Sequence, residues 1–419
     1  MWKTAKQERG QVLMLVAVLL TGLLGLVGLV VDAGHFYAER RQGQNAADQA
    51  ALAADRILFE NGTSSAAVSA ALDYAQANGY ESSQVTVYIP PLSGEHVGDA
   101  KYVEVIINEQ PQTLFIHVLA GGGDVQGRGV AGFVLYPEPY AIIVLDPDDC
   151  AAFQQQGNAT LNVSGGGVMV NSNCPASALS KIGAGNINVE YSIDVNGGSS
   201  VSGSGSVSPS PETVPWTVSD PLASLVPPPR GAPAPGSTGT AAVPKTWKHT
   251  GSSSLTLQPG TYYGGFEGNC SCTITLQPGI YIMSGGGFNK AGSTNFVGDE
   301  VMIYVTTNPE NPIGDGAPKP FDLEGSGALD LSPMTTGTYY GITLWQDAAI
   351  TTNFKMRGSN DLLSGLVYAP GATLDISGDS DFGTIQLVVN KFSLSGNAPL
   401  NLTYGSFRDF EAPKVTLVE

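Results

Sequence analysis

The phrase LTLQPGTY at residues 255–262 returns as ITLQPGIY at residues 274–281, with six of eight positions identical at an offset of 19. In each copy, apolar and polar residues alternate before a Pro-Gly turn, a pattern typical of a short strand with one buried face. A second phrase recurs as GNATLNVS (157–164), GATLDIS (371–377), GNAPLNLT (396–403) and the shorter GALDLS (327–332). No unit of this size buries its own apolar face, so we expect the units to stack into a parallel β-helix.

The competing architecture is a β-sandwich of glycine-rich hairpins. The repeated phrases keep one in-out phase, and no Asn-Gly hairpin turn joins paired runs, which favours the parallel β-helix. Residues 206–249, rich in Pro, Ser and Gly, predict an extended excursion or linker. It separates a first β-helical part (140–205) from the main β-helical domain (250–419). The pattern leaves open whether the two parts form one solenoid.

An unbroken apolar run without charges covers residues 12–31. Twenty residues at about 1.5 Å each span roughly 30 Å, the hydrocarbon thickness of a bilayer, which predicts a transmembrane helix. A cleaved secretory signal would have a shorter apolar region and a small-x-small cleavage site, whereas Asp32 and His35 follow this run. The basic N-terminus, residues 1–11, predicts a single-pass protein of the cytoplasmic membrane with its N-terminus inside and the bulk of the chain extracytoplasmic.

The helix is expected to continue through an alanine-rich extension, residues 32–60, which contains QNAADQAALAAD at 44–55. Together with ERGQ at 8–11 and VDAG at 31–34, this segment resembles the N-terminal domain of TadG-like Flp pilus-assembly proteins. The resemblance spans residues 8–55. It implies a membrane anchor and a role in assembling or anchoring a Flp-type pilus, with the lipid bilayer and pilus-assembly or envelope proteins as partners.

One position departs from the pattern of the pilins in this system. Prepilins and TadE-like pseudopilins carry a Glu five residues after the cleavage-site Gly, whereas Leu15 occupies that position after Gly10. We therefore do not expect the chain to be processed as a pilin.

Residues 61–139 predict a small α+β module. Ser64 or Ser65 is expected to cap a helix that runs to about Gln76. The alternating segments that follow predict strands at residues 85–89, 102–107, 114–119 and 129–135.

The composition limits both the fold class and the partners. Gly accounts for 53 of the 419 residues and charged residues for only 13%, which predicts a mainly β chain after the N-terminal helices. The net charge of −18 argues against a nucleic-acid partner, because phosphate binding requires clustered Lys and Arg. The chain contains no phosphate loop, nucleophile elbow or metalloprotease helix motif, so we expect no enzymatic activity and no cofactor.

Four cysteines, Cys150, Cys174, Cys270 and Cys272, are candidates for structural disulfides in an oxidising compartment. A bridge between Cys150 and Cys174 would close a loop of about 24 residues and stabilise the fold by roughly 3 kcal/mol in the loop-entropy model. A Cys270–Cys272 bridge is less favoured, because an i, i+2 bridge is geometrically strained. Zinc is not expected, since Cys-x-Cys differs from the usual ligand spacing and the four His are scattered.

Residues 140–146 predict a buried strand that ends in an acidic turn, Asp146-Pro147-Asp148-Asp149. Some TadG-like proteins carry a von Willebrand A domain, whose metal site opens with Asp-x-Ser-x-Ser at the end of such a strand. Both serines are missing here. We therefore expect a solvated acidic turn, with an incidental calcium contact as the alternative.

A carbohydrate-binding or carbohydrate-cleaving protein is the alternative function, because extracellular β-helices often act on acidic polysaccharides; an adhesin is a third. The residues such a face would use are Asp322, Asp330, Asp347, Lys355 and Arg357, with a sugar-stacking surface of Tyr262, Tyr263, Tyr281, Tyr339 and Tyr340. Ordinary roles as solvated or packed coil residues account for all ten. The leading prediction is a non-enzymatic, membrane-anchored protein of Flp pilus assembly that exposes a β-helical domain outside the cytoplasm.

Overall fold

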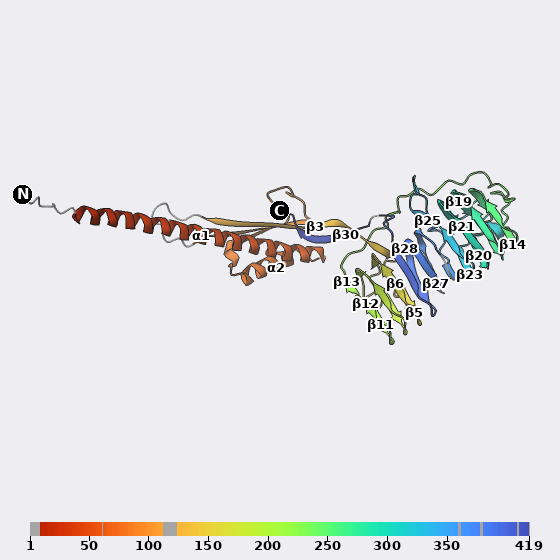
Figure 1. Cartoon of the computed structure of the whole chain (residues 1–419), viewed down its shortest axis with the longest axis horizontal. Helices are drawn as coiled ribbons and strands as arrows, with labels where there is room; N and C mark the ends of the chain where they lie inside the picture. The colour runs from red at the N-terminus through yellow and green to blue at the C-terminus, as the bar shows by residue number, and fades with distance from the viewer. Residues whose placement is uncertain are drawn as a thin grey trace, which may run out of the picture. The chain divides into compact units, whose positions relative to one another are not determined.

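A computed structural model describes residues 9–60, 62–111, 124–358, 362–377, 380–408 and 410–418. The chain forms two compact units, and Figure 1 labels some of their helices and strands. Unit 1 contains residues 1–135 and 413–419, and unit 2 contains residues 136–412. The strand expected at residues 114–119 lies outside the described residues.

Unit 1 is an α+β module in which two helices and a four-stranded sheet share one core. Its elements are α1 (Arg9–Phe59), α2 (Ser64–Ala77), the short 3-10 helix η1 (Ser82–Gln84), β1 (Val85–Tyr88), β2 (Tyr102–Glu109), β3 (Val125–Glu138) and β30 (Phe410–Leu417). The strand order is β1-β2-β3-β30, with antiparallel β1–β2 and β2–β3 pairs. The expected helix cap was wrong by one residue: Thr63 is extended and its side chain accepts the Ala66 N–H, so Ser64 is already helical.

Small residues allow α1 to lie directly against β3. A Cβ atom added at Gly127 would lie 2.3 Å from the carbonyl oxygen of Gly43, and one at Gly129 would lie 2.7 Å from the backbone of Ala47. The alanines buried in this core are Ala46, Ala47, Ala50, Ala51 and Ala54 of α1 and Ala67, Ala71 and Ala75 of α2. The alanine-rich run therefore serves as a packing surface.

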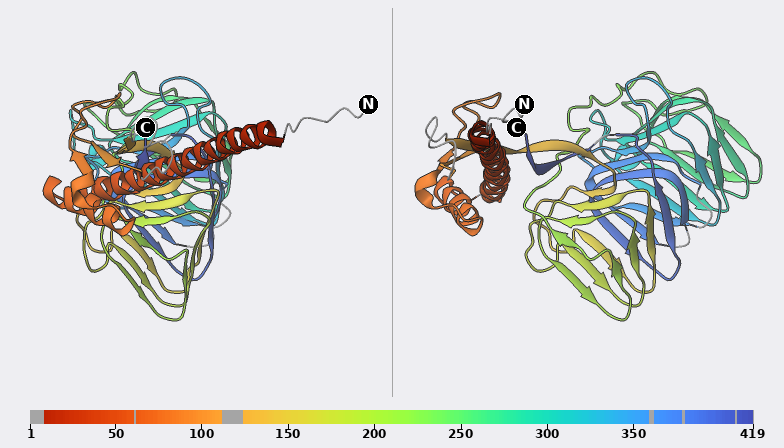
Figure 2. Two further views of the ribbon diagram at one scale, coloured as in Figure 1. Left: turned by 90° about the vertical axis from the view of Figure 1, so that its left-hand side faces the viewer. Right: turned by 60° about the vertical axis from the view of Figure 1, so that its left-hand side comes forward.

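Unit 2 is a parallel β-solenoid, which confirms the fold class predicted from the repeats, and Figure 2 shows its coils stacked. Its first face contains, in spatial order, β13 (Glu212–Thr213), β10 (Ile193–Val195), β7 (Gly167–Val170), β4 (Tyr140–Val144), β28 (Ser380–Ser395), β27 (Gly365–Ser377), β25 (Ile342–Gln346), β22 (Val301–Thr306), β19 (Gly279–Ser284) and β16 (Gly260–Tyr263).

The second face contains β11 (Ser199–Ser202), β8 (Leu179–Ile182), β5 (Phe153–Gln156), the later parts of β28 and β27, β26 (Phe354–Gly358), β23 (Phe321–Gly325), β20 (Phe288–Gly292), β17 (Phe266–Cys270) and β14 (Trp247–Gly251). The third face contains β12 (Val207–Ser208), β9 (Ile187–Val189), β6 (Leu161–Ser164) and β29 (Leu400–Tyr404), followed by the start of β28. A separate sheet contains β15 (Leu255–Leu257), β18 (Thr273–Leu276), β21 (Asn295–Gly298) and β24 (Leu329–Leu331). A second 3-10 helix, η2 (Gly314–Gly316), lies in the connection between β22 and β23.

The chain enters the solenoid in the middle of the stack. β4 pairs with β7 on one side and with β28 on the other, both in parallel. From β4 the coils wind outward to β13 at one end. The chain then starts again at β14, at the other end, and winds inward to β28 and β29. The two predicted β-helical parts therefore form one continuous solenoid.

The seam between the two runs joins two copies of one repeated phrase. Leu400 pairs with Leu161, so the copy at 396–403 stacks directly on the copy at 157–164. The Nδ2 of Asn162 donates to Oδ1 of Asn401 at 2.7 Å. Residues about 240 positions apart thus make ordinary neighbouring-coil contacts.

The predicted excursion lies along the outer surface of the first face; we call residues 214–246 the strap. Val214, Val218 and Leu222 are buried there in one apolar cluster with outward-facing side chains such as Tyr368. The Tyr368 hydroxyl donates to Asp220 Oδ2 at 2.6 Å. Strands of this face such as β4 and β22 are buried on both sides, so they require a cover, and the strap provides it.

Several strands differ from the boundaries expected from sequence. β12 and β13 fall inside residues 206–249, β14 also begins inside this range, and β30 pairs in the sheet of unit 1 although residues 250–419 were expected to be β-helical throughout. The reason is that an alternating strand carries the same local pattern in either sheet, and only its pairing partner decides where it belongs.

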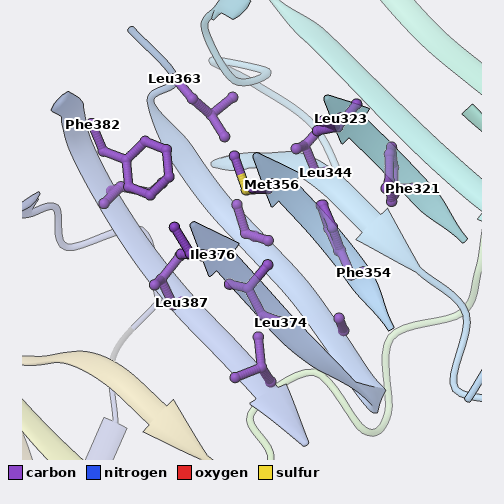
Figure 3. Packing of buried hydrophobic residues seen from close by; sticks show 14 of the residues in the cluster. Phe321, Leu323, Leu344, Phe354, Met356, Leu363, Leu374, Ile376, Phe382 and Leu387 are labelled. Atoms are coloured by element: carbon purple, nitrogen blue, oxygen red, sulfur yellow. The ribbon is translucent and has the colours of Figure 1, made fainter. Parts of the chain in front are cut away.

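Large apolar side chains fill the interior of the solenoid in columns that run from coil to coil. Figure 3 shows part of this core. The rings of Phe321 and Phe354, which come from neighbouring coils, stack at 4.6 Å. Leu257 and Leu276, from the two copies of the Pro-Gly phrase, pair in register, are both buried, and occupy equivalent sites as predicted.

Replacing Leu276 with Asp tests this register. The Leu276→Asp change places an unpaired carboxylate in the buried column, and we expect it to lower the free energy of unfolding by at least about 3 kcal/mol. Thr275→Asp is the matched control, because Thr275 is half-buried on the opposite face of the same strand and should cost well under half as much. Thermal unfolding of the two variants measures the difference, and equal losses would contradict the assigned phase.

Candidate functional site

The first half of α1 carries its apolar side chains on the outside. From Leu13 to Val31 most of the large apolar side chains are more than half exposed, Met14 and Leu13 by 74% each. Within the described residues, α1 is the one helix long and apolar enough to cross a membrane. An apolar surface of this length is unfavourable in water and requires lipid or another apolar helix as cover.

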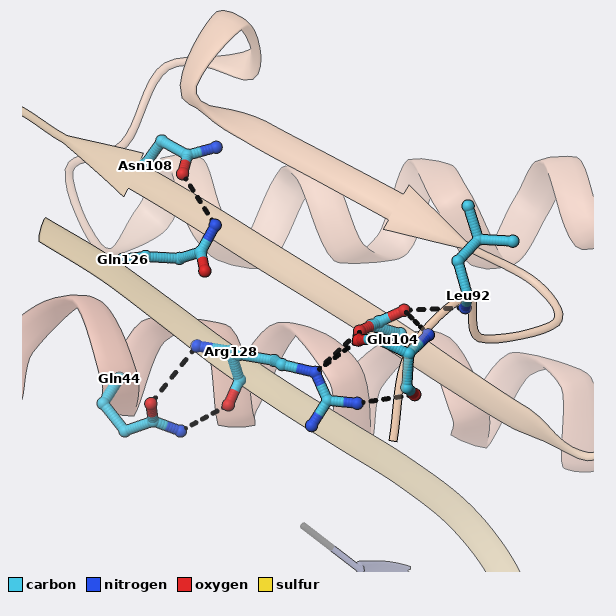
Figure 4. Close-up of polar contacts among 7 residues, drawn as sticks. Gln44, Leu92, Glu104, Asn108, Gln126 and Arg128 are labelled. Atoms are coloured by element: carbon cyan, nitrogen blue, oxygen red, sulfur yellow. Dashed lines mark hydrogen bonds and ion pairs between the residues drawn. The ribbon is translucent and has the colours of Figure 1, made fainter. Parts of the chain in front are cut away.

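A side chain of the alanine-rich motif connects the second half of α1 to β3 within unit 1. Gln44 Nε2 donates to the carbonyl oxygen of Arg128 at 2.6 Å, and the Arg128 N–H donates back to Gln44 Oε1 at 3.2 Å (Figure 4). Gln44 thus pairs with β3 as another strand would. The motif QNAADQAALAAD begins with this Gln, but its pattern alone indicates no partner for the side chain.

An ion pair between half-buried Arg128 and buried Glu104 extends this connection across the sheet. Arg128 Nε lies 2.6 Å from Oε1 of Glu104, whose side chain is fully buried (Figure 4). The other carboxylate oxygen accepts the Leu92 N–H at 2.8 Å, and the Ser93 hydroxyl donates to the same carboxylate. Burial alone would raise the pKa of Glu104, but these hydrogen bonds from Ser93, Arg128 and Leu92 outweigh it and lower the pKa. The loop after β1 is therefore tied to β2 and β3.

A polar cavity of about 690 Å³ lies in unit 1, beside the part of α1 that follows the apolar run. It is lined by His35, Glu39, Ser83, Gln84, Asn108, Glu109, Gln110, Pro111 and Asp124. The Nε2 of His35 lies 3.4 Å from Oε1 of Glu39. Burial and the neighbouring Glu39 raise the pKa of Glu109 above its usual range. Three carboxyl groups and one His make this cavity suited to a cationic or hydrogen-bonding group of a partner.

Asp55 is the most unusual polar group of this core. Its side chain is fully buried, and neither carboxylate oxygen has a hydrogen-bond partner among the described residues. Burial raises its pKa to about 7. The sequence showed Asp55 only as the last residue of a helical motif, and its burial follows from the packing of α1 against the sheet.

The four cysteines form two disulfides in the structure. The sulfur atoms of Cys150 and Cys174, 24 residues apart, are joined, and so are those of Cys270 and Cys272. One ring nitrogen of His249 and the sulfurs of Cys270 and Cys272 lie within 4.8 Å of one another. Spacing alone did not indicate this neighbour, because His249 comes from the preceding strand of the stack.

The charged residues expected on a carbohydrate-active face lie in different segments and have different partners. Lys355 and Arg357 on β26 form ion pairs with Asp322, Glu324 and Asp375 of adjacent strands, which makes a half-exposed ladder on the second face. Asp330 is exposed on β24, in the separate sheet. Asp347 accepts hydrogen bonds from the Tyr304 and Thr306 hydroxyls. Asp322, Asp330 and Asp347 therefore lie in three different segments: Asp322 is paired with a cation and Asp347 with two hydroxyl groups.

Four of the five tyrosines make internal hydrogen bonds. Tyr262 and Tyr281 are fully buried, and each hydroxyl donates to the carbonyl of the Gln four residues earlier, in the turn of its own phrase. The Tyr263 and Tyr339 hydroxyls donate to the strap carbonyls of Gly231 and Val226. Tyr340 alone of the five is exposed, so these residues do not form a sugar-stacking surface.

The acidic turn after β4 closes on itself and on the next coil. Asp146 Oδ1 accepts the backbone N–H groups of Asp148 and Asp149. Lys391 donates to the carboxylate of Asp149 and lies 3.8 Å from that of Asp146. The contacts of Lys391 with these two carboxylates therefore help to hold β4 beside β28.

The fold and this site define a protein with an apolar N-terminal helix, a small α+β module packed on that helix, and a parallel β-solenoid. Residues 10–77 match the family model described as putative Flp pilus-assembly TadE/G-like, so this N-terminal domain is TadE/G-like, as the resemblance predicted. The matched segment covers nearly all of α1 and α2, including Gln44 and the buried alanines. No curated protein and no solved structure matches the chain.

Replacing Asp55 with Asn tests the burial of this carboxyl group. The unfolded chain releases the Asp55 proton near pH 4, whereas the folded chain holds it to about pH 7, so the stability of unit 1 falls as the pH rises between these values. Asp55→Asn removes that loss. We expect the variant to gain stability over the natural protein from pH 4 to pH 8, by up to about 4 kcal/mol.

Hydrogen exchange of peptides covering residues 44–59, compared between the two proteins at each pH, measures this gain. Asp73→Asn is the control, because Asp73 is exposed on α2 and its replacement should leave the pH dependence unchanged. A difference between the Asp55→Asn variant and the natural protein that does not grow with pH would contradict the assignment.

Proposed function

We propose that this protein is a non-enzymatic, single-pass protein of the cytoplasmic membrane that contributes to the assembly or anchoring of a Flp-type pilus. The observation that carries the proposal is the continuity of α1. The first part of this helix exposes its apolar side chains. The same unbroken helix then packs against α2 and the four-stranded sheet of unit 1, within the segment that matches the TadE/G-like family.

The mechanism follows from the stiffness of that connection. At about 1.5 Å per residue, the 51 residues of α1 span roughly 77 Å. The close contact of Gly43 with Gly127 and the pairing of Gln44 with Arg128 fix the second half of the helix to β3. Insertion of the first half in a bilayer would therefore hold unit 1 near the membrane surface.

Two surfaces of the protein support a role in binding other proteins. The acidic cavity between His35, Glu39 and Glu109 begins within two turns of Val31 and could accept a cationic side chain of a membrane-proximal partner. The solenoid offers long, regular faces whose charged side chains are already engaged in ion pairs, as on β26. Both features favour positioning of other proteins over catalysis.

The orientation can be tested with protease. The N-terminus should be cytoplasmic and residues after about 35 outside, so protease added to intact spheroplasts should digest unit 2. Detergent-lysed spheroplasts serve as the control for digestion of the whole chain. If unit 2 is protected until lysis, the orientation is reversed.

The role in the pilus can be tested by deletion and complementation. Cells that lack the protein should lose Flp-type pili, as counted by electron microscopy, and the full chain should restore them. The matched control replaces residues 12–31 with a cleavable secretory signal, which exports the same domains without the anchor and should fail to restore pili. Normal piliation in the deletion strain would contradict the proposed role.

A further inference from the structure

Three residues with metal-binding side chains meet at one end of the solenoid. His249 lies in β14, Cys270 ends β17, and Cys272 directly precedes β18. Parallel pairing brings them together, because Gly251 aligns with Cys270 and His249 aligns with Gly268. One nitrogen of His249 and both sulfurs lie within 4.8 Å of one another. Cys270 and Cys272 are only 5% and 8% exposed, and His249 is half-buried.

The hydrogen bonds around this group resemble those that orient metal ligands. The Nε2 of His249 lies 2.7 Å from the carbonyl oxygen of Ser253, which can only accept a proton. In neutral His249 the proton is therefore on Nε2, and the lone pair is on Nδ1. Metal-binding His residues typically donate their second ring N–H to a carbonyl or carboxylate in this way.

Cys270 is held in place by a buried hydroxyl group. Its backbone N–H donates to Thr294 Oγ1 at 2.8 Å, and the same hydroxyl donates to the Cys270 carbonyl at 3.1 Å. Thr294 is fully buried. The backbone that carries the first sulfur is therefore fixed by groups other than the disulfide itself.

We propose that Cys270, Cys272 and His249 form a redox-gated zinc site. A dithiol reductant donates two electrons and two protons to the Cys270–Cys272 bond and becomes a disulfide, leaving two thiols. Zn²⁺ then binds both sulfurs and the His249 nitrogen as the two thiol protons are released. Two thiolates and one imidazole nitrogen are ligands that tetrahedral zinc prefers. The fourth position is left for water or a ligand from a partner.

The second disulfide provides an internal comparison. Among the residues that the structure describes, His249, Cys270 and Cys272 form the one group of this kind, and Cys150 and Cys174 belong to none. A reduced Cys150–Cys174 pair would therefore lack the third ligand. Zinc should protect one pair of cysteines from alkylation and not the other.

The experiment uses the full chain in detergent micelles, reduced with a phosphine under nitrogen and given one equivalent of Zn²⁺. Circular dichroism first establishes that the reduced protein retains its strand signal. Alkylation by N-ethylmaleimide is then followed by peptide mass spectrometry. We expect zinc to slow the alkylation of Cys270 and Cys272 at least tenfold and to leave Cys150 and Cys174 unaffected. Substituted Co²⁺ should show thiolate charge-transfer absorption.

Variants distinguish zinc binding that requires His249 from zinc binding by the two thiols alone. In the His249→Gln variant, the alkylation of Cys270 and Cys272 in the presence of zinc should be at least tenfold faster than in the natural protein. The His96→Gln change, in unit 1, should leave this rate unaltered. Equal protection of all four cysteines, no protection of any, or full protection in His249→Gln would each overturn the proposal. The measurement on the natural protein decides the question even if a variant fails to fold.

Discussion

Each coil of the solenoid buries its inward-facing apolar side chains in columns shared with the coils above and below it. No coil is stable alone, so the stack must be continuous from end to end. This constraint explains why the seam between the two runs is as well packed as any other step: Phe392 stacks on Phe153 at 4.9 Å, and Leu400 pairs with Leu161. Two copies of one repeated phrase, at 157–164 and 396–403, meet at this seam.

The order of the coils amounts to a circular permutation of an ordinary solenoid. Both runs advance in the same direction along the stack, and the strap connects the last coil of the first run to the first coil of the second. The chain therefore enters at β4 and leaves after β29 near the middle of the stack. Unit 2 is an insertion between β3 and β30, two strands of unit 1. The strap also covers an apolar outer face, so the connection contributes to stability as well as to topology.

The sequence pattern of a single segment was enough to predict its structure where that segment's composition and periodicity determine it. The apolar run, the alanine-rich helix, the repeated phrases and the strands of residues 85–109 were all predicted close to their observed positions. It failed where a partner distant in sequence decides the outcome. The prolines of residues 206–249 predict an extended excursion or linker, but they do not indicate which face of the solenoid the strap covers. The alternation in β30 predicts a strand but does not indicate to which sheet it belongs. His249 and Asp55 were missed because strand stacking and helix packing create their surroundings.

The sequence by itself determined the class of each part: an apolar helix from its hydropathy and length, a TadE/G-like domain from its motif, and a parallel β-helix from the period and phase of its repeats. These properties reside in short segments, whose periodicity fixes which face is buried. Only the tertiary structure decided that the two β-helical parts are one solenoid entered at its middle, that Gln44 pairs with β3, and that His249 lies beside Cys270 and Cys272. Each of these facts is a contact between distant segments, and such contacts are selected by the burial of the whole assembly.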